Sequence, residues 1–105
     1  MDMESNGQDS LDADIHATID RISDRRIAAE EESYARSQSL IDFVAPHIDK
    51  MTDENERRGS LMLITEFALW RKAEHDKAIA EIESQREELR TAFSAWLERT
   101  DAPEA

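Results

Sequence analysis

The stretch PHIDKMTDENERRG, residues 46–59, holds the only clear interruption within the body of this 105-residue chain. Proline lacks a backbone donor and disfavours helical angles at the residue before it, and glycine is a weak helix former. The chain's other glycine and proline lie close to its ends: Gly7 and Pro103. We therefore expect one turn region over 46–60 with a long uninterrupted segment on each side of it.

Both long segments repeat their stripe residues in helical steps of three and four. Before the turn the stripe positions are Leu11, Ile15, Ile19, Ile22, Ala29, Ser33, Ser37, Leu40, Val44 and Ile48. After the turn they are Ile64, Phe67, Ala68, His75, Ala78, Ile79, Ile82, Leu89, Ala92, Phe93 and Trp96. This spacing keeps one stripe of each helix facing a neighbour. The sequence thus predicts an all-α fold, a long antiparallel helical hairpin of coiled-coil type.

The expected boundaries follow from capping residues and composition. Ser10 is the expected cap of a first helix over 10–45, after a disordered acidic tail over 1–9. A second helix over 61–99 is expected to be followed by a frayed tail over 100–105. Three residues in the turn region are candidates to cap the second helix: Thr52, Asp53 and Ser60.

A turn near Asn55 would set Ile22 against Leu89, and we expect this pair to be buried between the helices far from the turn. The stripe is thin at Ser33 and Ser37, so we expect the second helix either to approach closely at that level or to be held weakly there.

The composition limits how much core one chain can build. Hydrophobic residues make up 39% of the chain and charged residues 36%, with a formal net charge of −12. That apolar content suffices for one buried stripe per helix but not for a thick core, unless subunits share one. We therefore expect a homodimer in which two hairpins form a four-helix bundle.

The stretch from Leu61 to Trp70 exceeds the needs of a simple hairpin, because its apolar residues point around nearly the whole helix axis. One neighbouring helix could cover only part of them. In one interpretation, Pro46–Met51 folds back as a lid. In the other, this part is a dimer or partner interface. The predicted interaction residues are Phe43, Leu61, Met62, Leu63, Phe67, Leu69 and Trp70.

The sequence predicts no catalytic, cofactor or metal site, no small-molecule substrate and no enzyme activity. The chain has no cysteine, which excludes thiolate chemistry. Asp12, His16 and Asp20 form a row at helical spacing, but a solvated acidic face explains that row better than a metal site does. His75 on the second stripe is expected to pack at the core edge with a hydrogen bond.

Charge and hydropathy indicate the compartment and the partners. The acidic start is the opposite of a secretory signal, and the longest uninterrupted apolar runs, Leu61–Ile64 among them, have only four residues. We therefore expect a cytoplasmic protein without a membrane segment. The acidic surface disfavours direct binding of nucleic acid.

The function expected from the sequence is that of a non-enzymatic protein that binds and modulates or chaperones another protein through an apolar helix surface. The alternative is an acidic inhibitor whose carboxylates, such as those of Glu30, Glu31 and Glu32, imitate nucleic acid and block a nucleic-acid-binding protein.

Overall fold

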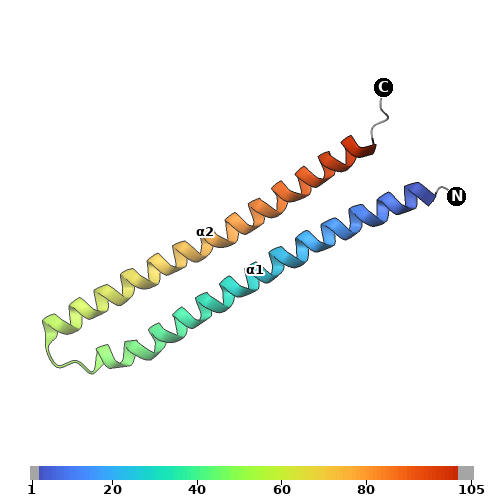
Figure 1. Ribbon diagram of the computed structural model, residues 1–105. Helices are drawn as coiled ribbons and strands as arrows, with labels where there is room; N and C mark the ends of the chain where they lie inside the picture. The colour runs from blue at the N-terminus through green and yellow to red at the C-terminus, as the bar shows by residue number, and fades with distance from the viewer. Residues whose placement is uncertain (1–2, 102–105) are drawn as a thin grey trace. The chain divides into compact units, whose positions relative to one another are not determined.

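The computed structural model describes residues 3–101 and consists of two long helices joined by a short linker (Figure 1). Helix α1 spans Met3–Asp49 and α2 spans Glu54–Asp101. Residues 3–101 contain no strand. The two helices form an antiparallel hairpin with contacts between them, which confirms the predicted all-α hairpin.

Helix α1 begins earlier than the sequence predicted. Residues 3–9 of the expected tail are helical, and Ser10 lies inside α1, so the predicted cap at Ser10 is wrong. Gly7 is the weakest helix former in this stretch, and one interior glycine costs only about 1 kcal/mol. Residues 1–2 of that expected tail lie outside the described residues, as do residues 102–105 of the other one. Residues 100–101 belong to α2.

The turn is much shorter than the predicted region 46–60. Pro46 lies inside α1 near its end, where its missing N–H removes one helical hydrogen bond. Ile48, two residues later, is only 4% exposed, and its burial stabilises this last turn. Gly59 lies inside α2. The interpretation of Pro46–Met51 as a lid is therefore wrong for residues 46–49, which continue the helix.

Asp53 is the residue that caps α2. Its Oδ1 accepts hydrogen bonds from the backbone N–H groups of Asn55 at 2.9 Å and Glu56 at 3.1 Å. The Asp53 carbonyl accepts the first helical bond from the Arg57 N–H at 2.9 Å. A carboxylate here satisfies otherwise unpaired donors and favours the positive end of the helix dipole. Of the three predicted capping candidates, Asp53 fills the role.

The chain divides into two compact units. The turn unit is Ala28–Ile79, and the end unit comprises the residues up to Ile27 together with those from Ala80 onward. In each unit a part of α1 runs antiparallel beside a part of α2.

Each unit has a very small core. Among the described side chains, three hydrophobic residues are buried: Ile48 in the turn unit, and Ile19 and Ile82 in the end unit. Two helices can shield only one narrow stripe from water, so many large apolar side chains stay exposed. Within residues 3–101, neither helix has a stretch that is both long and apolar enough to cross a lipid bilayer.

Candidate protein-interaction site

The interaction residues predicted from the sequence are exposed on the turn unit, and together we call them the turn-proximal surface. The exposed fractions are 68% for Phe43, 52% for Leu61, 59% for Met62, 69% for Leu63, 66% for Leu69 and 58% for Trp70. Phe67, the seventh residue, is half-buried. Six large hydrophobic side chains on one unit therefore lie in contact with water.

An apolar groove runs between the two helices of the turn unit, and we call it the turn groove. Its volume is about 480 Å³. It is lined by Leu40, Val44, Ile48, Met51, Ser60, Leu63, Ile64 and Phe67. The ring of Trp70 lies next to this groove, with its centroid 6.1 Å from that of Phe67. Of the predicted residues, Leu63 and Phe67 thus meet in the groove and Trp70 extends it.

The exposed apolar residues occupy two sides of α2. At about 100° per residue, Leu63 and Trp70 project on the side of the turn groove. Met62 and Leu69 project on the side of α2 that faces away from α1. Phe43 is on α1, where its ring lies against that of His47 one turn later, at a centroid distance of 5.1 Å. The structure therefore does not gather all seven predicted residues into one patch.

Charged residues are nearly absent from this part of the chain. Residues 37–48 and 59–70 contain one Asp or Glu each, Asp42 and Glu66, and no Lys or Arg, although 36% of the whole chain is charged. Covering such a surface removes apolar area from water and desolvates few ions, which makes burial favourable.

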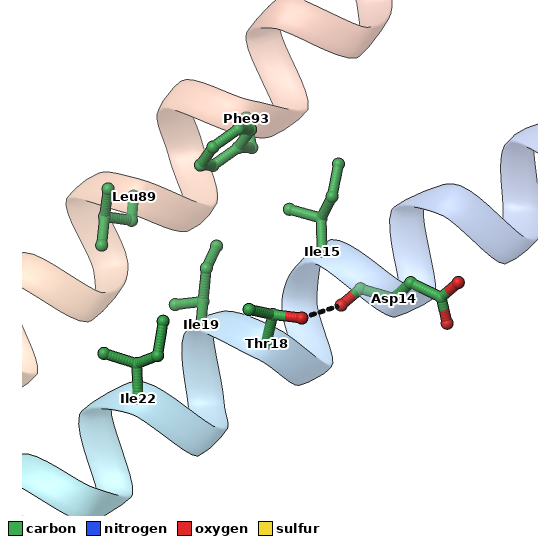
Figure 2. A pocket seen from close by; sticks show the side chains of 7 residues that line it. All are labelled: Asp14, Ile15, Thr18, Ile19, Ile22, Leu89 and Phe93. Atoms are coloured by element: carbon green, nitrogen blue, oxygen red, sulfur yellow. Dashed lines mark hydrogen bonds between the residues drawn. The ribbon is translucent and has the colours of Figure 1, made fainter.

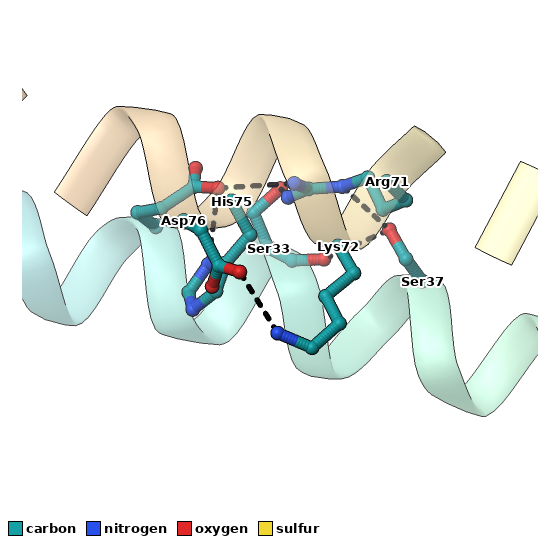
Figure 3. Close-up of polar contacts among 7 residues, drawn as sticks. Ser33, Ser37, Arg71, Lys72, His75 and Asp76 are labelled. Carbon is teal, nitrogen blue, oxygen red and sulfur yellow. Dashed lines mark hydrogen bonds and ion pairs between the residues drawn. The ribbon is translucent and has the colours of Figure 1, made fainter. Parts of the chain in front are cut away.

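A polar cluster around Arg71 joins the helices of the turn unit beyond the groove (Figure 3). The Arg71 guanidinium donates to Glu30 Oε1 at 3.0 Å, Ser33 Oγ at 3.2 Å and Ser37 Oγ at 3.1 Å. Its side chain is only 12% exposed. The two serines are the thin part of the first stripe, and their small size makes room for the guanidinium between the helices. The second helix is thus held at this level by hydrogen bonds.

His75 and Tyr34 complete this Arg71 cluster. The two rings stack at a centroid distance of 4.3 Å, and His75 Nδ1 lies 3.3 Å from Glu30 Oε1. His75 therefore packs at the helix interface with a polar contact, as expected from its place on the stripe. Sequence reasoning missed Arg71, Tyr34 and the pairing of Glu30. The available signal was two serines at interior positions, which can accept hydrogen bonds from a long cationic side chain.

The Arg71 cluster makes the stability of the turn unit depend on pH. Desolvation raises the pKa of Glu30, but hydrogen bonds from Arg71 and His75 and their positive charges outweigh it, so this pKa lies below its ordinary value of 4.5. A carboxyl whose pKa is depressed by folding stabilises the fold above its unfolded pKa, and that contribution is lost as pH falls through the folded pKa.

We expect Glu30→Gln to reduce stability at neutral pH and to flatten the loss of stability below about pH 4.5. Urea denaturation followed by circular dichroism at a series of pH values measures this. Glu31→Gln, at an exposed neighbouring position, is the control. Identical pH profiles for the two variants would contradict the role given to Glu30.

The row of Asp12, His16 and Asp20 in the end unit is not assembled as a metal site. His16 Nε2 lies 3.1 Å from Asp12 Oδ1, but Asp20 pairs across the hairpin with Arg90. Among the described residues, no group of three or more His, Cys, Asp or Glu side chains is placed to hold a metal ion.

No protein-family model, curated protein or solved structure matches this chain. Its function has to be inferred from the exposed surfaces and the charges around them.

Proposed function

We propose that this is a non-enzymatic cytoplasmic protein that binds another protein and modulates or chaperones it, docking a helix of that partner on the turn-proximal surface. One observation carries the proposal: Leu63 and Trp70 are 69% and 58% exposed beside an apolar groove. An apolar surface of this kind, with few charges, is typical of binding sites. The partner's helix would place its own apolar face in the turn groove.

The aromatic residues are the expected anchors of the complex. Trp and other large side chains that become fully covered contribute most of the binding energy at protein interfaces. Trp70 already rests against Phe67, so it loses little side-chain freedom on binding. This preorganisation favours affinity.

The proposal includes a homodimer in which two hairpins form a four-helix bundle, because the hydrophobic core of a single chain is so small. A second hairpin in such a bundle covers only one side of α2. Met62 and Leu69, on the side away from α1, would remain exposed. A different protein that covers both sides therefore accounts better for the turn-proximal surface.

Two of the three carboxylates considered for nucleic-acid mimicry pair with arginines of the same chain. Glu30 pairs with Arg71 at 3.0 Å and Glu32 with Arg36 at 3.0 Å. This pairing favours binding through the apolar surface over the acidic inhibitor. Salt distinguishes the two, since an apolar interface changes little between low and moderate ionic strength while binding by carboxylates weakens steeply.

The test is capture of the partner from host extract by the immobilised wild type and by the double variant Leu63→Glu/Trp70→Glu. We expect the double variant to lose the partner by at least about tenfold, because two carboxylates would have to be buried. The control is Ala73→Glu/Ala80→Glu, which adds the same charge at exposed positions of α2 outside the surface.

Circular dichroism should show the same helix content for all three proteins. Equal capture by wild type and Leu63→Glu/Trp70→Glu would refute the assignment of this surface.

A further inference from the structure

The end unit has an apolar groove of its own, which we call the end groove (Figure 2). Its volume is about 400 Å³. The apolar residues along it are Ile15, Ile19, Ile22, Leu89 and Phe93. Thr18 also lines the groove, and its hydroxyl donates to the Asp14 carbonyl at 2.8 Å, so its polar atom is already satisfied.

Three side chains of the end groove are only partly covered by the chain itself, whereas Ile19 is buried. Ile22 is 51% exposed, Leu89 44% and Phe93 38%. On the side of the end unit opposite the groove, ion pairs join α1 to α2. There Arg86 meets Asp24 at 2.6 Å, and Arg90 pairs with Asp20. One side of the end unit is thus satisfied within the chain, and the groove side is not.

Charges of opposite sign flank the end groove. At about 100° per residue, Arg25 projects at the outer rim on α1, and Glu81 and Glu88 project at the outer rim on α2. All three are exposed, and among the described side chains none of them has an ion pair or a hydrogen bond. At the level of Arg25 the groove therefore has a positive α1 rim and a negative α2 rim, and Asp14 lines the groove about three turns away on α1.

We propose that a second copy of this chain occupies the end groove, with α1 of each copy packed beside α2 of the other around a twofold axis. A twofold interface meets the same patch on both subunits, so Arg25 of each copy faces Glu81 and Glu88 of the other. The charges of the two rims are thus complementary when two copies of the chain meet in this way. For this reason we assign a second copy of the chain as the occupant of the groove.

The register of the hairpin supports this pairing. Ile22 and Leu89 line the same groove, and the two helices are antiparallel, so the level of Arg25 falls between those of Glu81 and Glu88. Arg25 is then level with Arg86, so Glu88 lies within one helical turn of it and Glu81 within about one and a half turns, distances that a long arginine side chain spans. The inference rests on the homodimer of the proposed function and assigns the interface of that dimer to the end unit.

The experiment measures the dimer dissociation constant of the full chain by sedimentation velocity and light scattering. Ile22→Asp is expected to weaken the dimer by about a hundredfold or more, since it places a charge in the shared core. Circular dichroism should show that its helices persist, because Ile22 is half-exposed within one copy.

Charge exchange tests the register independently of folding. Arg25→Glu is expected to weaken the dimer by about tenfold, and adding Glu81→Arg and Glu88→Arg to it is expected to restore the dimer. Arg58→Glu is the matched control, because Arg58 is exposed in the turn unit, outside the end unit, and should change nothing.

Three outcomes would overturn the inference. They are a wild type that stays monomeric at high concentration, a dimer indifferent to Ile22→Asp and Arg25→Glu, and an Arg25→Glu defect that the reversed pair does not rescue. The variant Leu63→Glu/Trp70→Glu should remain dimeric. If it alone dissociates, the interface lies at the turn-proximal surface instead. Partner capture is read separately, so failure of the dimer assignment and failure of the proposed function are distinguishable.

Discussion

An Ile19→Asp substitution is expected to lower the free energy of unfolding by about 3–5 kcal/mol, because it buries an unpaired carboxylate and removes an aliphatic side chain from the core. Ile19 is 6% exposed and lies between α1 and α2 in the end unit. With so few other buried hydrophobic residues, the chain has little capacity to compensate. Partial or complete loss of helix structure at room temperature is the expected appearance of this variant.

Urea denaturation followed by circular dichroism measures the effect. Ala17→Asp is the control, since it adds the same charge to α1 at an exposed position two residues away and should cost less than about 1 kcal/mol. Equal midpoints for the two variants would show that α1 and α2 are not packed together at this level.

The sequence had instead indicated Ile22 and Leu89 as the buried pair of this region. They do line one groove, so the predicted pairing of their levels is confirmed. Their burial within a single chain was predicted wrongly, because they are 51% and 44% exposed. A charge at either position should therefore cost a single chain much less than a charge at Ile19.

The second large effect is expected in the Arg71 cluster. Glu30→Leu alone should destabilise the fold by about 2–3 kcal/mol, because it leaves the guanidinium of Arg71 largely buried without its carboxylate. Glu30→Leu combined with Arg71→Met should be nearly neutral, since the desolvation of both charges is then avoided. Ser37 keeps a partner in the double variant, because its hydroxyl donates to the Ser33 carbonyl at 3.2 Å.

A double-mutant cycle by urea denaturation measures this coupling. The control is Glu32→Leu, which removes an exposed pair with Arg36 and should cost less than about 1 kcal/mol. If the losses in unfolding free energy of the two single variants simply add in the double variant, Glu30 and Arg71 are not coupled. That result would contradict the role given to this pair in the Arg71 cluster.

Much of the fold follows from local rules. The spacing of Ile15, Ile19 and Ile22 predicts a helix and the face that it turns toward a neighbouring helix. The position of the turn follows from the breakers and from Asp53, whose short carboxylate caps α2. The bounds were harder to predict, because Pro46 and Gly59 are tolerated inside long helices once neighbouring residues such as Ile48 are buried.

By itself, the sequence determined that the chain forms two helices, where they turn and which large apolar residues exceed the needs of one hairpin. These features depend on the spacing of residues close in sequence. Only the tertiary structure decided that Arg71 reaches Glu30 across the hairpin, and that Ile19 is buried while Ile22 lines an open groove. Those outcomes depend on the rotation and separation of two helices, which are set by contacts between residues far apart in the chain.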